Sequence, residues 1–315
     1  MMRKYARILT IFAVCSFTLA FCRPARAGNI ALPPEALHAM DRMYSGDPDS
    51  AMTIARDLEK SQSEHPLGYL LEAEAQWWKM YCAACEIKWG MVDAWKRGKA
   101  SGDDDYLALA DKVIQLAQAQ LAKSDTAEMH TYAGIGYGLK TRLYGLRGEH
   151  RAVAKAGVSS RAEFLLALKL DPDDADATAG VGLYNFYVDT LSPIVKVLRF
   201  FMGIPGGNKE EGIRQIQKGA DHGVLMAVDS RYYLAKDLRT YDLKYEQALS
   251  VAEPLAAHYP RNPVFLLLLG NLNMELGRND KAREYFRSVL ANSEEDSVCQ
   301  KKMHELAEAF SAALK

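Results

Sequence analysis

The sequence predicts an all-α protein built as a solenoid of repeated helix–turn–helix units. Apolar residues recur at helical spacing along most of the chain, and no segment alternates apolar and polar residues over the length of a strand. Two stretches near the C-terminus share one pattern, 34 residues apart. Without its first 27 residues the chain has 288, which is long for one compact core and suits either two domains or a repeat array.

Composition excludes several classes of protein. The 315 residues include 49% hydrophobic and 25% charged residues, which is ample apolar material for a folded core. With 39 Lys and Arg against 40 Asp and Glu, the net charge of −1 argues against a nucleic-acid-binding protein. One long apolar run exists, at the N-terminus, so a polytopic membrane protein is also excluded.

The N-terminal segment has the order of parts found in a secretory signal peptide. Arg3, Lys4 and Arg7 precede the uncharged, largely apolar residues 8–21, and Ala25-Arg26-Ala27 resembles a signal-peptidase site. We therefore expect cleavage after Ala27 and a periplasmic or secreted protein. An uncleaved anchor is the weaker alternative, because the apolar run is shorter than the roughly 20 residues that span a bilayer.

A second alternative is a lipoprotein that carries its lipid on Cys22. The resemblance to such lipoproteins implies a small residue just before the cysteine, and the bulky Phe21 at that position disfavours the lipoprotein alternative.

Cleavage after Ala27 removes five basic and no acidic residues, leaving 34 Lys and Arg against 40 Asp and Glu, a net charge of −6. That charge suits solubility and argues against nonspecific binding to nucleic acid or anionic lipid.

The repeat elements can be placed in order along the chain. An early turn at Gly46 precedes a helix that carries Ala51 and Leu58 on one face. A later helix carries Phe164 and ends before the turn residues 171–174, and a further unit opens at Gly182 and has Gly212, Ile216 and Gly219 in its second helix. About six helix pairs follow from this spacing, closed by a final helix at roughly 297–314.

Two units near the C-terminus are clearest. A stripe of apolar residues at helical spacing occurs twice with the same offsets, once in Ala248, Val251, Ala252, Leu255 and Ala256, and again in Ala282, Tyr285, Phe286, Val289 and Leu290. Ala248 and Ala282 are small, so the helices of each unit can approach closely.

This spacing, together with Leu269-Gly270, Leu276-Gly277, Tyr245 and Pro260, resembles the tetratricopeptide repeat. The resemblance implies a right-handed superhelical solenoid, with degenerate units over 28–228, an insertion near 189–207, and two clear units and a capping helix over 229–315. Much of the chain also resembles exported bacterial proteins of this family that have no assigned activity. The family implies an extended concave surface for a protein or peptide partner.

Cys82-Ala83-Ala84-Cys85 is the most chemically suggestive motif. If one helix continues through it, Cys82 and Cys85 lie on the same side together with Trp78 and Trp89. Buried structural thiols, a Cys82–Cys85 disulfide and a redox pair are the three interpretations, and the structural ones are favoured. Haem attachment and a zinc site are not indicated, since Glu86 stands where haem attachment needs His and too few Cys are available.

Aromatic and basic side chains give the candidate partner-binding residues. All four tryptophans lie within 77–95. Of these, Trp78 and Trp89, together with the more distant Tyr184, either line a binding pocket or pack in the core. Arg147 and Arg151 are four residues apart in a basic stretch and form either a solvated face or an anion site.

The segment 191–207 interrupts the repeats. Its apolar stripe is Ile194, Val197, Leu198, Phe201 and Met202. One interpretation is a third helix that covers the core of the solenoid, and the other is an amphipathic element offered to a partner or a membrane surface.

Catalytic motifs are not apparent. His304-Glu305 lacks the second His of a zinc-protease motif, and no nucleophile elbow or phosphate-binding loop occurs. The sequence therefore predicts a non-catalytic exported scaffold that binds a protein or peptide in the cell envelope, without a cofactor or metal and with possible peripheral envelope association. The alternative is a redox or small-ligand-binding protein that uses the Cys82/Cys85 helix and the nearby tryptophans.

Overall fold

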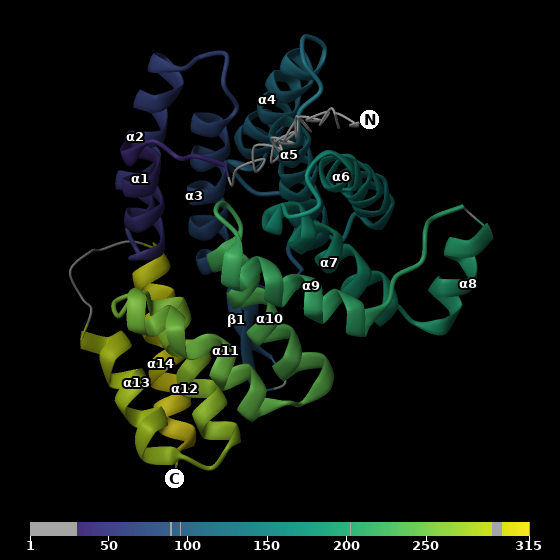
Figure 1. Cartoon of the computed structure of the whole chain (residues 1–315). Coiled ribbons are helices and arrows are strands. Elements are labelled where there is room, and N and C mark those ends of the chain that lie inside the picture. The colour runs from purple at the N-terminus through teal and green to yellow at the C-terminus, as the bar shows by residue number, and fades with distance from the viewer. Residues whose placement is uncertain (1–29, 89, 95, 202, 292–297, 315) are drawn as a thin grey trace, which may run out of the picture.

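The computed structural model describes residues 30–88, 90–94, 96–201, 203–291 and 298–314. Within these ranges the chain forms fourteen helices and one β-hairpin (Figure 1). The elements are α1 (Pro34–Tyr44), α2 (Pro48–Ser61), α3 (Leu67–Ala83), β1 (Cys85–Lys88), β2 (Met91–Ala94), α4 (Asp103–Leu121), α5 (Ala127–Arg147), α6 (His150–Leu170), α7 (Ala175–Thr190), α8 (Pro193–Phe201), α9 (Lys209–His222), α10 (Ala227–Asp242), α11 (Tyr245–His258), α12 (Pro263–Glu275), α13 (Asn279–Ala291) and α14 (Val298–Ala313).

The helices pack as consecutive pairs, which confirms the predicted helical repeat solenoid. The six pairs in the described ranges are α1–α2, α3–α4, α5–α6, α7–α9, α10–α11 and α12–α13, and α14 follows as the expected final helix. The predicted glycines Gly212 and Gly219 lie in α9, whereas Gly182, expected to open a unit, lies inside α7. There Gly182 packs directly on α9, because a Cβ at this position would come within 3.0 Å of the Gly212 carbonyl oxygen.

Local sequence signals set where many of these helices begin. The side chains of Asp47, Thr126, Asp174, Asn208 and Asn262 each accept a hydrogen bond from a backbone N–H in the first turn of the following helix. These bonds satisfy N–H groups that have no partner inside the helix. Gly148 and Gly277 follow α5 and α12 with φ values of 69° and 70°, a conformation that glycine adopts without strain.

The first helix of most pairs is buried on nearly every side. Residues 129–136 of α5, 175–182 of α7 and 263–273 of α12 are buried without a break, whereas α2, α9 and α13 bury a single face. A helix that is apolar all round must have neighbours on all sides. The first helices therefore pack against their own second helices and also against one another across the inside of the arc.

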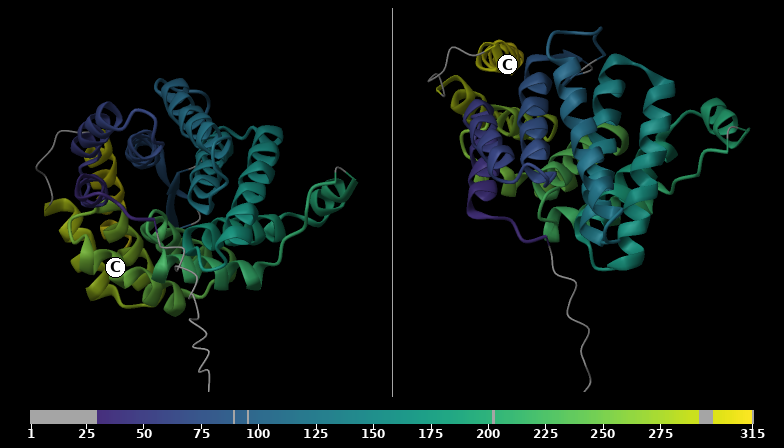
Figure 2. Two further views of the ribbon diagram at one scale, coloured as in Figure 1. Left: turned by 45° about the horizontal axis from the view of Figure 1, so that its top comes forward. Right: turned by 90° about the horizontal axis from the view of Figure 1, so that it is seen from above.

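The C-terminal pairs return to the N-terminal ones, as the two turned views show (Figure 2). Asn262, at the start of α12, donates its amide N–H to the Tyr44 carbonyl oxygen at the end of α1, at 2.9 Å. Trp77 of α3 donates its indole N–H to the Tyr233 hydroxyl of α10 at 2.9 Å. The hydroxyls of Tyr81 of α3 and Tyr232 of α10 are hydrogen-bonded to each other at 2.7 Å. The inner surface of the superhelix is thus filled by the chain itself around α3.

The β-hairpin corrects the expectation that one helix continues from Trp78 through Cys85 to Trp89. Helix α3 ends at Ala83, and β1 pairs antiparallel with β2, with Ile87 opposite Val92 and Lys88 opposite Met91. Gly90 has φ 76° at the turn, and its carbonyl oxygen accepts hydrogen bonds from Asn271 and Arg239. Contacts with α10 and α12 therefore stabilise a hairpin that is too short to be stable alone.

The insertion at 189–207 forms an arm that carries α8 away from the other helices (Figures 1 and 2). This arrangement contradicts the interpretation in which the segment covers the core of the solenoid. The side chains of the predicted stripe, Ile194, Val197, Leu198, Phe201 and Met202, lie outside the described residues.

Candidate functional site

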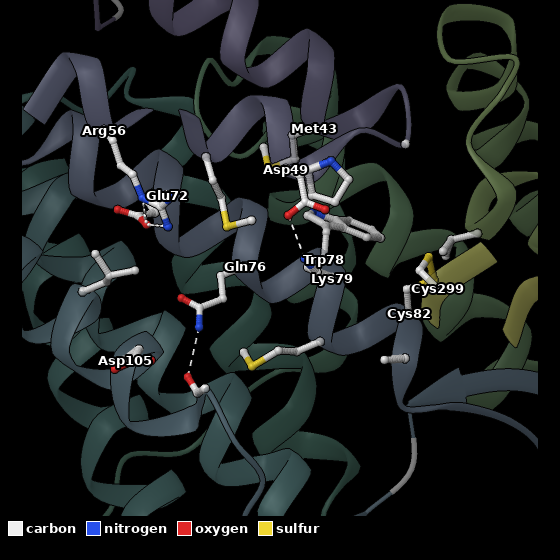
Figure 3. A pocket seen from close by; sticks show the side chains of 18 of the residues that line it. Met43, Asp49, Arg56, Glu72, Gln76, Trp78, Lys79, Cys82, Asp105 and Cys299 are labelled. Atoms are coloured by element: carbon white, nitrogen blue, oxygen red, sulfur yellow. Dashed lines mark hydrogen bonds and ion pairs between the residues drawn. A yellow bond between two sulfur atoms is a disulfide. The ribbon is translucent and has the colours of Figure 1, made fainter. Parts of the chain in front are cut away.

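A groove with a volume of about 1060 Å³ runs along one side of α3 (Figure 3). Its floor is the polar stripe of α3, formed by Tyr69, Glu72, Gln76 and Lys79, which are spaced so that they share one helix face. One wall is α2, with Pro48, Asp49, Met52 and Arg56, and the other is α4, with Asp105, Ala108, Leu109 and Lys112. The groove exists because α2 and α4 pack on either side of α3 and leave this face between them uncovered.

Residues from the far end of the chain close one end of the groove. Asn262, Pro263 and Val264 at the start of α12 line it, together with Cys299 and Gln300 at the start of α14. This end exists only because the C-terminal helices return to α3.

Two ion pairs cross from the α2 wall to the α3 floor. Arg56 Nε lies 2.7 Å from Glu72 Oε1, and Lys79 Nζ lies 2.7 Å from Asp49 Oδ1. The Arg56 side chain is 55% exposed and that of Lys79 48%. The Lys79–Asp49 pair is exposed on both sides and stabilises the fold by only about 0–1 kcal/mol, so a bound partner can replace it at little cost. In the Arg56–Glu72 pair, the Glu72 side chain is only 10% exposed.

The α4 wall presents one acid and one base that form no ion pair within the described ranges, Asp105 and Lys112. Lys112 Nζ lies over the Tyr69 ring, 5.7 Å from its centroid. Met43, Met52 and Met80 add flexible apolar side chains to the lining. Methionine adapts its shape to different partners, and such side chains are frequent on protein-binding surfaces.

A carboxyl group with a perturbed pKa lies beside the groove. Burial, together with the neighbouring Glu72 carboxyl, raises the pKa of Glu59 to about 8. One of its carboxylate oxygens is buried and makes no hydrogen bond. Glu59 therefore carries a proton in the folded protein at pH values where an exposed Glu is ionised.

Beneath the groove floor, a buried charged cluster joins three inner helices. Arg142 of α5 contacts Glu74 of α3 at 2.6 Å and Asp229 of α10 at 2.7 Å, and Trp78 donates its indole N–H to Asp229 at 3.2 Å. Burial raises the pKa of Glu74 to about 8, opposed by Arg142 and reinforced by Asp229. For Arg142, the two carboxylates outweigh the lowering effect of burial and raise its pKa. This cluster holds the closed arc together.

The cysteines pair differently from the expectation. Cys82 forms a disulfide with Cys299 of α14, with 5.3 Å between the Cα atoms, and Cys85 is free and fully buried. Two of the three interpretations, the Cys82–Cys85 disulfide and the redox pair, are therefore wrong, because Cys82 is bound to Cys299 and Cys85 lies in β1, beyond the end of α3. Burial, reinforced by Asp93, raises the pKa of the Cys85 thiol, which disfavours the reactive thiolate.

The structure separates the other predicted site residues. Trp78 lines the groove but is only 5% exposed, while Tyr184 donates a hydrogen bond to the Pro205 carbonyl oxygen at the base of the arm. Arg147 pairs with Glu149, and Arg151 lies exposed on α6. Trp89 lies outside the described residues. These side chains do not form one site.

Apart from Trp78 and Cys82, the groove residues were missed by reasoning from sequence. One signal for them was present: the polar side chains Glu72, Gln76 and Lys79 recur at helical spacing within a helix that is otherwise apolar. The two walls carried no comparable signal, because their position depends on how α2 and α4 pack.

Comparison with protein families places a known repeat at the C-terminal end. Residues 244–303 match the family model of the tetratricopeptide repeat, over α11, α12, α13 and the start of α14. The chain is of the tetratricopeptide-repeat type. Its C-terminal repeat suggests a scaffold for protein–protein interaction.

The described ranges contain neither a cluster of metal-binding side chains nor a bilayer-spanning helix. No group of three or more His, Cys, Asp or Glu side chains is arranged there to hold a metal ion. Nor does any helix in those ranges combine the length and the apolar character needed to cross a bilayer.

Proposed function

We propose that this chain is an exported, non-catalytic scaffold that binds a segment of a partner protein in the groove along α3. The observation that carries the proposal is the groove itself, with its flexible methionines, the exposed Lys79–Asp49 pair, and Asp105 and Lys112, which form no ion pair within the described ranges. The inner faces of the repeats, where such a solenoid would otherwise offer its concave surface, are packed against one another.

The groove fits an amphipathic partner segment. Its apolar residues would contact Met52, Met80 and Leu109, and its charges would face Asp105 and Lys112, which are seven residues apart on α4. Two helical turns separate these two groups, so a helix with a base and an acid at the same spacing complements them.

Site-specific photo-cross-linking in the native host tests this assignment. A photoreactive amino acid placed at Met52 or at Leu109 should yield the same adduct, and Arg56→Glu combined with Lys79→Glu should abolish it. The matched control position is Leu166, which is 43% exposed on α6, away from the groove. Adducts that form equally from position 166, or that persist in the charge-reversed protein, would contradict the proposal.

Export is part of the proposal. The signal-like residues 1–27 support it, and so does the Cys82–Cys299 disulfide, since disulfides persist mainly in oxidising compartments. Mass spectrometry of the protein from a periplasmic or secreted fraction should show a chain that begins at Gly28. A diacylated chain that begins at Cys22 would support the lipoprotein alternative instead.

The redox alternative has less support. It requires a Cys82/Cys85 dithiol, whereas Cys82 is bound to Cys299 and Cys85 is buried. Small-ligand binding through Trp78 is also disfavoured, because this side chain is engaged with Asp229 in the core.

A further inference from the structure

The arm between α7 and α9 is fixed at its base. The Asp189 carboxylate accepts hydrogen bonds from Lys196 Nζ at 2.9 Å and from the Lys209 backbone N–H at 3.0 Å, so it joins the outgoing and returning chain. Tyr184 and Arg199 both donate to the Pro205 carbonyl oxygen, at 2.8 and 3.2 Å. These contacts hold α8 in the position away from the body that Figure 2 shows.

The arm exposes several large apolar side chains. Phe200 is 78% exposed, the largest exposed fraction among the large hydrophobic residues described, and Val195 and Leu191 are 41% and 37% exposed. A helix kept for packing would bury such groups against its own fold. Here the contacts at the base keep α8 away from the other helices, and these side chains remain exposed.

The charge of the arm is opposite to that of the rest of the chain. Residues 189–207 contain Lys196, Arg199 and a single acidic residue, Asp189, which gives a net charge of +1, whereas the chain from residue 28 onward carries a net charge of −6. Lys196 pairs with Asp189 at a half-exposed position, and Arg199 contacts an uncharged carbonyl, so the arm keeps a local excess of positive charge.

From this geometry we infer that α8 docks onto a membrane surface that contains anionic lipid. A short helix that carries Phe, Val and Leu beside basic side chains, and no acid, suits the boundary between headgroups and acyl chains. There the apolar groups enter the boundary region, and Lys196 and Arg199 contact lipid phosphates. A groove on a folded partner protein would have to surround the arm. A flat membrane surface would contact only the side of the arm that faces away from the other helices. The inference does not depend on the groove along α3.

Vesicle sedimentation of the purified chain from residue 28 onward tests the inference. The protein should sediment with vesicles of phosphatidylglycerol and phosphatidylethanolamine, and far less with phosphatidylcholine alone. Phe200→Ser combined with Val195→Ser should lower the bound fraction at least fivefold. Lys196→Gln combined with Arg199→Gln should remove most of the dependence on ionic strength.

The matched control is Leu165→Ser combined with Leu166→Ser on α6, where the two side chains are 40% and 43% exposed. This variant should sediment as the parent protein does. Thermal unfolding by circular dichroism should be unchanged in the Phe200→Ser/Val195→Ser variant, because α8 stands outside the core. Lys196→Gln with Arg199→Gln also removes two contacts at the base of the arm, so the serine variant is the one that decides the inference.

Three results would overturn the inference. The parent protein does not sediment with the anionic vesicles, the arm variants sediment as it does, or the arm variants alter self-association in analytical ultracentrifugation and leave sedimentation with vesicles unchanged. The last result would assign the arm to contact between copies of the chain. If the parent protein forms no groove adducts but still binds the vesicles, the proposed scaffold function fails and this inference stands.

Discussion

Arg142 of α5 and Asp229 of α10 are 87 residues apart in the chain, and their side chains meet at 2.7 Å inside the arc of helices. Arg142 also contacts Glu74 of α3, so one guanidinium connects three helix pairs. The side chains of Arg142, Glu74 and Asp229 are 15%, 9% and 2% exposed. This contact closes the inner surface of the solenoid, so the surface of α3 that stays open is the groove on its other side.

Replacing Arg142 by Ala should strongly destabilise the fold. The change leaves Glu74 and Asp229 buried without a cation, and breaking a buried pair in this way costs about 3–5 kcal/mol. Urea unfolding followed by circular dichroism measures the loss. Arg151→Ala, at an exposed position on α6, is the control and should change the free energy of unfolding by less than about 0.5 kcal/mol. Equal effects of the two changes would contradict the assigned role of the cluster.

The Cys82–Cys299 disulfide should contribute to stability and leave Cys85 as the reduced cysteine of the mature chain. The bond closes a loop with a sequence separation of 217, and Cys82→Ser with Cys299→Ser should lower stability by about 2–5 kcal/mol. A reducing agent should lower the Tm of the parent protein and not that of the double variant.

Alkylation provides an independent check on this pairing. The folded mature chain should not react, because Cys85 is buried. The unfolded chain should take up one label without reductant and three after reduction, since three of the five cysteines follow residue 27. A label on Cys82 or Cys299 without reductant would contradict the pairing.

Glu59 should make stability depend on pH. Its folded-state pKa of about 8 lies above the ordinary value of 4.5, so the folded chain keeps a proton that the unfolded chain releases between those values. The contribution of Glu59 to stability therefore falls as pH rises through this window. Glu59→Gln should gain stability relative to the parent protein between pH 5 and pH 8, as measured by urea midpoints. Glu64→Gln, at an 87% exposed side chain, should show no such trend.

Close packing within the tetratricopeptide repeat should depend on Gly270. A Cβ at this position of α12 would come within 2.3 Å of the Phe286 ring of α13, so Gly270→Ala should cost about 1–3 kcal/mol. Gly145→Ala in α5 is the matched control, because no atom other than those of its chain neighbours and the local helix backbone lies within 4 Å of its added Cβ. That change should stabilise the protein by up to about 1 kcal/mol, since alanine favours a helix. Differential scanning calorimetry distinguishes the two directions.

Much of the fold followed from local pattern. The repeated stripes at Ala248 and Ala282 predicted the helix pairs that match the tetratricopeptide repeat, and the estimate of about six pairs with a final helix agrees with the structure. Periodicity succeeds here because each pair is a local unit with one face to bury. The same reasoning extended α3 too far, since the hairpin from Cys85 to Ala94 depends on Arg239 and Asn271, which are distant in sequence.

The sequence by itself determined the helical class, the repeat length and the position of the insertion, because these depend on residues within one or two helical turns of each other. Only the tertiary structure decided the partner of Cys82, the burial of Trp78 and the presence of a groove along α3. All three depend on the return of α10, α12 and α14 to α3, which the Arg142 cluster and the aromatic contacts stabilise. Contacts of this range connect residues whose separation in sequence carries no period, so no local pattern reveals them.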